Sequence, residues 1–252
     1  MATQPVPPLE QHNREIALNR AYWDRKPLLR DVYHHFYLAI ADALGTKDGD
    51  GVLEMGSGIG AIKAVLPKCQ TSDIFPNPWL DRVESAYAIN CGDGALSGLV
   101  LFDVWHHLEY PTVALREFSR ALRPGGRVVL FEPAMGALGR LVYGAFHHEP
   151  LGLRKEIDWT VPEDKPPLRY YAAQGNAWRM FFHRAMPSHT ATPLTLRDVR
   201  TYSALSYVAS GGFSKPQLYP RALLPFMRGI EHLLDSAPRL FATRLLVVLE
   251  RV

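Results

Sequence analysis

The sequence predicts an α/β fold of the Rossmann-like, doubly wound type, built on a mostly parallel seven-stranded sheet. Short apolar runs that suit buried strands alternate with helical patterns between residues 51 and 132. A glycine-rich turn follows the first of these runs, as in nucleotide-binding βαβ units. The chain has 252 residues, 47% of them hydrophobic, which is enough for the core of one large α/β domain.

The order of the patterns predicts the elements. Helical periodicity covers 9–44 and is divided at Pro27, because proline disfavours helical geometry in the residue before it. The Pro-rich residues 1–8 are expected to be disordered. Further helices are predicted at 61–66, 111–122 and 226–234. The predicted strands are 51–56, 70–75, 82–85, 98–103, 127–132, 193–202 and 245–252.

We therefore expect a single domain, 1–252, in four consecutive parts. These are an N-terminal helical lid (9–45), a core around the glycine turn that would bind a cofactor (46–135), an inserted cap (136–190), and C-terminal strands and a helix that complete the sheet (191–252). The cap segment has no sustained period but is rich in aromatic residues, which favours a pocket cover over a disordered loop.

Composition excludes several classes of partner. The 28 basic and 25 acidic residues are interspersed, so a nucleic-acid partner is not expected. No stretch of 18 apolar residues and no leader-like segment occurs, so we expect a cytoplasmic protein without a membrane partner. Cys69 and Cys91 make neither a disulfide framework nor a metal motif. The oligomeric state is left open.

The glycine turn contains an acid that distinguishes between cofactors. Glu54 ends the first apolar run, and glycines follow at 56, 58 and 60. A carboxylate there would repel a pyrophosphate but attract a ligand that carries an ammonium and a sulfonium group, which favours S-adenosylmethionine. Asp73 comes 19 residues later, close to the interval of about 20 at which such folds place a carboxylate on ribose hydroxyls.

Four motifs in order carry a family resemblance. They are Glu54-x-Gly-x-Gly-x-Gly60, Asp73, His106-His-Leu108 and Leu122-Arg-Pro-Gly-Gly126. With them the chain resembles class I S-adenosylmethionine-dependent methyltransferases, in their small-molecule (methyltransferase type 11-like) branch. The resemblance covers 46–135 and is fainter in two segments, Phe146-His-His-Glu-Pro150 and Ser210-Gly-Gly-Phe213.

The resemblance implies roles for cofactor-binding residues. Glu54 and Gly56 would face the methionine part, Asp73 the ribose, and Ile74 the adenine. The full implied set is Tyr22, Glu54, Gly56, Ser57, Gly58, Asp73, Ile74, Ser85, Ala86, Phe102 and Asp103. Ser85 departs from the acid that is common in the family, so its hydrogen bond to adenine would lack charge assistance. The product would be S-adenosylhomocysteine.

Methyl transfer from a sulfonium is an in-line displacement, so alignment and exclusion of water supply most of the acceleration. A general base is required only where the acceptor must lose a proton. His107 and His106 are the catalytic candidates, although either could instead have a structural role. Adjacent helical residues point about 100° apart, so at most one of each histidine pair is expected to face the pocket. We expect no metal site, because the histidines are adjacent and no Cys or acid cluster completes a set.

The acceptor is expected to be a small aromatic or heteroaromatic metabolite, methylated on nitrogen or oxygen. Cap aromatics would stack on it; they are Tyr170, Tyr171, Trp178, Phe181, Phe182 and Tyr207. The predicted substrate-binding set is Trp23, His107, His147, His148, Tyr171, Trp178 and Tyr207. In size and layout the chain is similar to natural-product N-methyltransferases that act on toxoflavin-type azapteridines.

Two other functions stay open at this point. Gly56-x-Gly-x-x-Ala61 also satisfies the fingerprint of NAD(P)-dependent oxidoreductases, although Glu54 and the long helical segment before the first strand count against that class. A catalytically inactive binding protein with the methyltransferase fold is the second alternative.

Overall fold

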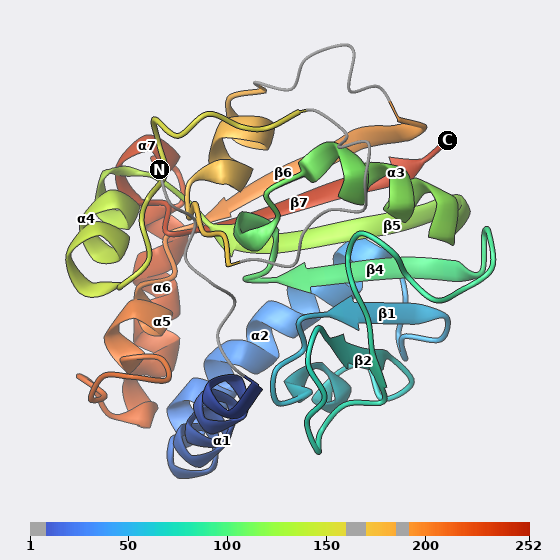
Figure 1. Cartoon of the computed structure of the whole chain (residues 1–252). Coiled ribbons are helices and arrows are strands. Elements are labelled where there is room, and N and C mark those ends of the chain that lie inside the picture. The colour runs from blue at the N-terminus through green and yellow to red at the C-terminus, as the bar shows by residue number, and fades with distance from the viewer. Residues whose placement is uncertain (1–8, 160–169, 185–191) are drawn as a thin grey trace.

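The computed structural model describes residues 9–159, 170–184 and 192–252, and the predicted disorder of 1–8 falls outside them. Seven strands form one sheet in the order β3-β2-β1-β4-β5-β7-β6 (Figure 1). Their bounds are β1 Val52–Met55, β2 Gln70–Asp73, β3 Arg82–Val83, β4 Leu96–Phe102, β5 Leu122–Pro133, β6 Leu194–Tyr202 and β7 Arg244–Arg251.

The sheet has the predicted doubly wound character. Strands β3, β2, β1, β4 and β5 pair in parallel, and β7 joins β5 antiparallel, with β6 antiparallel beyond it. The strand order reverses between β1 and β4, where open α/β sheets hold their ligands beyond the carboxyl ends of the strands. The predicted fold class is therefore confirmed.

Helices cover both faces of the sheet. Their bounds are α1 Leu9–Arg25, α2 Pro27–Leu44, α3 Pro111–Ala121, α4 Ala137–Phe146, α5 Leu205–Ser210, α6 Leu224–Leu234 and α7 Pro238–Phe241. Short turns are η1 Ala61–Ala64, η2 Trp105–His107, η3 Trp178–Phe182 and η5 Arg221–Leu223. In Figure 1, α3 lies in front of the sheet, and the end of α2 passes behind it.

The two core layers follow from strand alternation. Leu53 of β1 and Leu99 of β4 belong to the apolar cluster that includes Phe118 of α3, whereas Val52 and Val100 belong to the cluster under α2. Successive strand side chains point to opposite faces, so a strand buried on both sides must be apolar almost throughout. None of the described helices is long and apolar enough to cross a membrane.

Three elements differ from the prediction. The helix expected at 61–66 is only the 3₁₀ turn η1, because Pro67 limits Leu66 and leaves no room for a second turn. Helix α4 lies in the segment expected to be irregular; Gly139 allows it to pack against the backbone of Ala134, where a Cβ would approach the Ala134 oxygen to 2.0 Å. Strand β5 begins earlier than predicted and includes the Arg-Pro-Gly-Gly motif.

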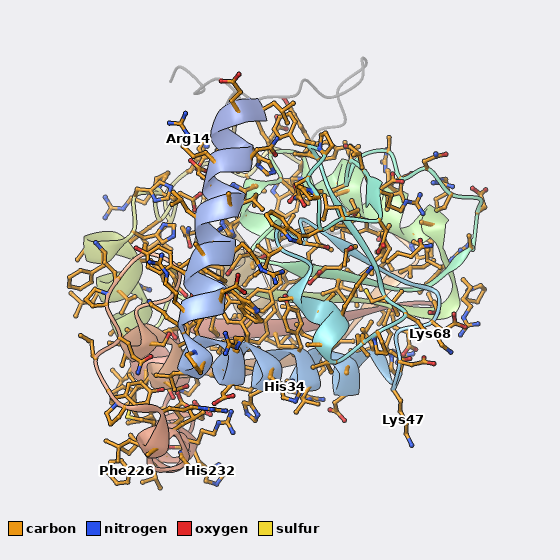
Figure 2. The ribbon with its side chains drawn as sticks, turned by 90° about the horizontal axis from the view of Figure 1, so that it is seen from below. Arg14, His34, Lys47, Lys68, Phe226 and His232 are labelled. Atoms are coloured by element: carbon orange, nitrogen blue, oxygen red, sulfur yellow. The ribbon has the colours of Figure 1, made fainter. Side chains whose placement is uncertain are left out.

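The predicted lid consists of two different helices. Pro27 begins α2, as expected, and α2 buries residues such as Leu29 and Ile40 against the sheet. Of the described residues in these two helices, His12 and Glu15 of α1 line the cavity at the carboxyl ends of β1, β2 and β4, and none of α2 does. Figure 2, which views the molecule from below, shows α1 and α2 in front of the sheet.

Candidate active site

A cavity of about 770 Å³ opens at the carboxyl ends of β1, β2 and β4. It contains most of the residues predicted from sequence. Those on its wall are Gly56, Asp73, Ile74, Ser85, Ala86, Asp103, His106, His107, His147, His148, Tyr171 and Tyr207. Those not on its wall are Tyr22, Trp23, Glu54, Ser57, Gly58, Phe102 and Trp178. We call the part around Gly56 and Asp73, where the sequence predicts a cofactor, the cofactor end, and the part around the four histidines the polar end.

At the cofactor end, the ends of β1 and β2 position the backbone of Gly56 and the carboxylate of Asp73. Gly56 follows β1 with a φ of +66°, and a Cβ there would come within 2.3 Å of Val104 Cγ2. Asp73 ends β2; its carboxylate accepts hydrogen bonds from the backbone N–H groups of Ile74 (2.7 Å) and Gly58 (3.3 Å). Burial raises the pKa of Asp73. The carboxylate is thus held rigidly at the cavity wall.

Glu54 is buried, and the structure does not bring it to the cavity. It shares a strand face with Val52, which packs under α2, and its side chain lies against Tyr37 of that helix. Burial raises the pKa of Glu54 to about 8, although hydrogen bonding to Ser57 and Tyr37 opposes the shift. One carboxyl oxygen, Oε2, has no hydrogen-bond partner within the described part of the chain. Strand alternation, which the sequence prediction did not apply here, decides this orientation.

Ser57 and Gly58 form the turn itself instead of the wall. The Ser57 hydroxyl donates to the backbone oxygen of Glu54 at 3.1 Å, and it accepts from the backbone N–H of Ser72. Gly58 donates its N–H to Asp73. These bonds tie the end of β1 to β2 and fix Asp73, so both residues support the cofactor end from behind.

Several predicted aromatic contacts belong to the core. Phe102 stacks on Tyr33 of α2, with ring centroids 5.1 Å apart, because it lies on the same strand face as Val100. Trp23 packs edge-on against Tyr33 and stacks on Phe213. Tyr22 lies beside the cationic groups of Arg25 and Lys26.

The π-helical turn η3 likewise points into the core. Trp178 is 2% exposed, stacks on Phe182 at 3.8 Å, and donates its indole N–H to His183. Phe181 is 1% exposed and packs on Trp105. Trp178 and Phe181 therefore hold the cap onto the sheet, and they do not offer the stacking surface expected from the sequence.

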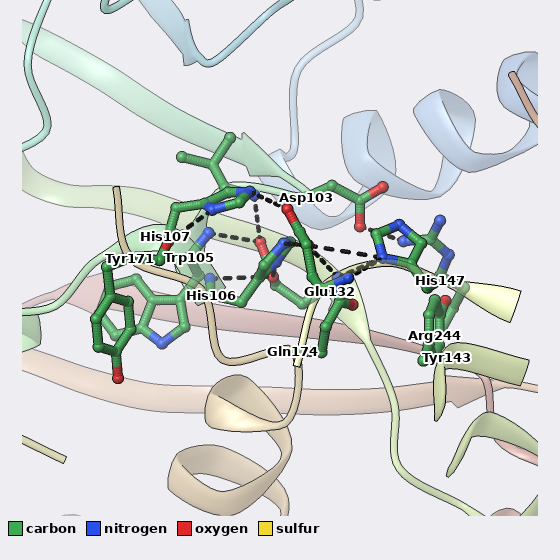
Figure 3. Close-up of polar contacts among 12 residues, drawn as sticks. Asp103, Trp105, His106, His107, Glu132, Tyr143, His147, Tyr171, Gln174 and Arg244 are labelled. Carbon is green, nitrogen blue, oxygen red and sulfur yellow. Dashed lines mark hydrogen bonds and ion pairs between the residues drawn. The ribbon is translucent and has the colours of Figure 1, made fainter. Parts of the chain in front are cut away.

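His106 lies between two carboxylates at the polar end. Its Nδ1 is 2.7 Å from Glu132, the last acid of β5, and its Nε2 is 3.3 Å from Glu149 (Figure 3 shows the Glu132 pair). Burial alone would lower the pKa of His106, but the two carboxylates outweigh it and raise the pKa to about 10. In this state His106 is an imidazolium and donates through both nitrogens.

His107 faces the cavity in the neutral form. Its Nδ1 lies 2.9 Å from the backbone oxygen of Tyr171, and 34% of its side chain is exposed (Figure 3). Burial and the charge of His106 lower the pKa of His107 to about 4, although Glu149 opposes this. Because a carbonyl can only accept, Nδ1 carries the proton and the lone pair lies on Nε2, 3.5 Å from Glu149.

The prediction that one member of each histidine pair faces the pocket is wrong, since all four histidines line the cavity. His106 and His107 lie in the 3₁₀ turn η2 with ring centroids 4.2 Å apart. His147 and His148 follow the end of α4 in extended backbone and stack on each other at 4.8 Å. Neither pair is on a regular α-helix, so the helical angle does not apply.

Sequence reasoning missed the acid that joins these histidines. Glu149 is hydrogen-bonded to the Tyr170 hydroxyl at 2.7 Å and to the side-chain amide of Gln174. Burial would raise the pKa of Glu149, but His106 and His107 hold it far below its ordinary value. A signal existed, because Glu149 directly follows the paired histidines in the Phe-His-His-Glu-Pro motif.

Arg244 is a second residue that the sequence prediction missed, and its side chain reaches from β7 to Asp103. Arg244 begins β7, and because β7 is antiparallel its first residue lies at the carboxyl ends of the parallel strands. Its buried guanidinium pairs with Asp103 and lies 4.4 Å from the Tyr207 ring centroid (Figure 3 shows the ion pair). Asp103 adopts a φ of +57°, an unusual backbone state that tends to occur at functional sites.

Comparison with known proteins assigns the fold and family. The family described as "Methyltransferase domain" matches residues 25–198. The chain belongs to this family. The family that the sequence resembles is confirmed.

Several solved structures share the fold of this chain. One is a geranyl diphosphate methyltransferase in complex with SAM (TM-score 0.50, 14% identity, 86% of this chain and 85% of that chain). Another is the geranyl diphosphate C-methyltransferase of Streptomyces coelicolor A3(2), solved with Mg²⁺, geranyl-S-thiolodiphosphate and S-adenosyl-L-homocysteine (TM-score 0.51, 15% identity, 87% and 76% coverage). At these identities the likeness establishes the fold alone.

A relative at the sequence level has no described activity. It is an uncharacterized 37.1 kDa protein in transposon TN4556 of Streptomyces fradiae, 30% identical over 128 residues, which are 43% of this chain. The match takes in 37% of that relative, so the chain spans little more than a third of its length.

Proposed function

We propose that this chain transfers the methyl group of S-adenosylmethionine to a small-molecule acceptor held at the polar end of the cavity. The observation that carries this proposal is one continuous cavity, which joins a cofactor end of the methyltransferase type to a cluster of histidines and tyrosines. A volume of about 770 Å³ lies within the range of small-molecule sites, about 300–1,000 Å³.

The cofactor end fits S-adenosylmethionine through residues already on its wall. Asp73 would accept hydrogen bonds from the ribose hydroxyls, since its carboxylate is fixed by two backbone N–H groups. Gly56 lets backbone approach where Val104 leaves no space for a Cβ. Ile74, Ser85 and Ala86 would border the adenine, and Asp103 the methionine end. The cofactor supplies an electrophilic methyl group.

The polar end would hold the acceptor and align its reacting atom. Tyr171 and Tyr207 provide aromatic surface on the wall, which supports an aromatic or heteroaromatic acceptor. His107, whose side chain faces the cavity, would lie beside the oxygen or nitrogen that receives the methyl group. Alignment of two reactants in a dry site can lower a barrier by about 7–11 kcal/mol, so no strong base is required. Neither methylation on nitrogen nor methylation on oxygen is favoured by a specific contact.

The test is a transfer assay that works whatever the acceptor is. The protein is incubated with methyl-labelled S-adenosylmethionine and a small-molecule extract of the cells that express it. Mass spectrometry should detect a labelled metabolite heavier by one CH₂ unit than an unlabelled one. The control is Asp73→Asn, which should give less labelled product when S-adenosylmethionine is not saturating.

Isothermal titration separates the remaining alternatives. Binding of S-adenosylmethionine and S-adenosylhomocysteine, but not NADH, is expected. Cofactor binding without any labelled product in the extract would favour the inactive binding protein and contradict the proposal, as would binding of NADH alone.

A further inference from the structure

Three side chains of the polar end direct donor atoms at one point. His106 Nε2 lies 3.3 Å from Glu149 Oε2, and His107 Nε2 lies 3.5 Å from Glu149 Oε1. One ligand atom from each residue falls within 4.8 Å of the other two. We propose that His106, His107 and Glu149 bind a divalent transition-metal ion.

Both imidazole rings are oriented in the way that metal-binding histidines require. The Nδ1 of His106 faces Glu132, and the Nδ1 of His107 faces the backbone oxygen of Tyr171. A carboxylate or carbonyl on the second nitrogen is the usual support of a ligating histidine, because it fixes the ring and presents Nε2 to the metal. Each Nε2 points to Glu149. The ion would displace the proton that otherwise lies on Nε2 of His106.

The distances agree with coordination geometry. Bonds of about 2.0–2.2 Å from Zn²⁺ to nitrogen and oxygen, at tetrahedral angles, place neighbouring donor atoms about 3.3–3.5 Å apart. The two measured separations from Glu149 are 3.3 Å and 3.5 Å. Each separation goes to a different oxygen of Glu149, and the two histidine donor atoms lie within 4.8 Å of each other, so the rings must approach each other to form the site.

A second group of donors nearby is less suitable. Asp103, His106 and Glu132 also lie within 4.8 Å of one another. However, Glu132 already accepts hydrogen bonds from the backbone N–H groups of Val104 and Trp105, at 2.8 Å and 2.7 Å, as well as facing His106. Asp103 is paired with Arg244. Backbone N–H groups hold Glu132 in place, whereas the partners of Glu149 other than histidines are the side chains of Tyr170 and Gln174, which can turn away. We therefore assign Glu132 the supporting role.

The donor set indicates the class of ion. Two imidazoles and one carboxylate suit Zn²⁺ or Fe²⁺, whereas Mg²⁺ and Ca²⁺ prefer oxygen ligands. Three protein ligands leave an open coordination position, as in catalytic metal sites. His106, His107 and Glu149 all line the cavity, so this position faces it.

The open position gives the acceptor a chemical class. Water or an acceptor oxygen would occupy it, so the acceptor would carry a hydroxyl or carboxylate group near the methylated atom. A divalent ion lowers the pKa of a bound hydroxyl, which makes it a better nucleophile. This part of the inference rests on the proposed function, whereas metal binding does not.

The structure also removes one reason for excluding a metal. The sequence showed only adjacent histidine pairs without an acid to complete a set. Glu149 supplies the acid from a distant segment, and the tight turn η2 lets both members of one pair reach it.

The experiment measures metal binding directly, with no cofactor present. Metal-stripped full-length protein is titrated with Zn²⁺ by calorimetry, and with Co²⁺, whose visible absorption reports imidazole ligation. One ion per chain is expected. The variants Glu149→Gln and His107→Ala should each lower the Zn²⁺ affinity by about 100-fold or more.

Matched controls are two exposed histidines that do not line the cavity, His34 on α2 and His232 on α6, both labelled in Figure 2. The variants His34→Ala and His232→Ala should leave the affinity unchanged, and excess Mg²⁺ should not displace Zn²⁺. Equal Zn²⁺ affinity in the wild type, Glu149→Gln and His107→Ala would overturn the site. So would the absence of binding, or a stoichiometry that falls in the His34 or His232 variant.

The same samples separate this inference from the proposed function. Circular dichroism shows whether each variant is folded. If Glu149→Gln does not fold, the Zn²⁺ affinity of His107→Ala decides whether the metal site exists. Titration with S-adenosylmethionine should give similar affinities for the wild type and both variants. Cofactor binding without metal binding overturns only the metal site, whereas metal binding without cofactor binding overturns only the methyltransferase proposal.

Discussion

The two ends of the cavity are built in different ways. At the cofactor end, Gly56 directly follows β1 and Asp73 is the last residue of β2, so a short stretch of sequence places each of them. At the polar end, η2, β5, the segment after α4 and the loop around Tyr171 meet from distant parts of the chain. A local motif could therefore reveal the first end but not the second.

Trp178→Ala is expected to have the largest effect, and only on stability. Removal of a Trp from a packed core costs about 3–5 kcal/mol of unfolding free energy, because a cavity replaces its contacts. Trp178 is 2% exposed and does not line the ligand cavity. Urea denaturation measures the loss, with the exposed Leu240→Ala as control. Unchanged stability together with weaker acceptor binding would instead restore the substrate role predicted from the sequence.

Arg244→Met should destabilise the junction between the two ends. The variant leaves Asp103 without its cation, and breaking such a pair costs about 3 kcal/mol, near the low end of the usual range, because a third of the Asp103 side chain is exposed. The matched control is Arg197→Met, since Arg197 is a half-exposed partner of Glu250. That variant should cost under about 1 kcal/mol. Similar losses in the two variants would contradict the structural role of the Arg244 pair.

Asp73→Asn should weaken S-adenosylmethionine binding at an intact fold. Loss of a charge-assisted hydrogen bond costs about 1.5–3 kcal/mol, or about 10- to 100-fold in affinity. Calorimetry measures the change. Asp50→Asn is the control, because this exposed aspartate precedes the opposite end of β1. An equal affinity for Asp73→Asn and the wild type would remove the main support of the cofactor end.

Glu54 differs from Asp73 in lying off the cavity wall, and its burial can be tested through the pH dependence of stability. The folded-state pKa of about 8 exceeds the ordinary value of 4.5, so the folded chain binds more protons than the unfolded chain between these values. The free energy of unfolding should therefore fall as pH rises from 5 to 8, by about 1.4 kcal/mol per unit.

Because His106 and His107 also change their proton binding on unfolding in this pH range, the measure is the difference between chains. The fall should be smaller by this amount in Glu54→Gln than in the wild type, whereas Glu10→Gln, an exposed control on α1, should match the wild type. Urea denaturation at each pH measures both. The carboxyl lies off the cavity wall, so the cofactor affinity of Glu54→Gln should stay near that of the wild type at pH 7. A large loss of affinity would support the contact that the sequence alone suggests.

The sequence determined the fold and much of the cofactor end. Apolar runs with turn residues between them specify buried parallel strands, and a residue that directly follows such a strand must lie at its carboxyl edge. Gly56 and Asp103 directly follow a strand and Asp73 ends one, so this rule places all three at the carboxyl edge of the sheet. The family resemblance follows from the same local motifs.

Only the tertiary structure decided which side chains face the ligand. Glu54 and Phe102 lie within their strands, so the choice between the cavity and α2 depends on which sheet face they share. Glu149 is 42 residues after His107, and Arg244 is on β7, the last strand in the sequence. Sequence spacing therefore cannot pair Glu149 with the histidines or Arg244 with Asp103. Contacts between segments far apart in the chain arise from packing of the whole domain, and the polar end consists almost entirely of such contacts.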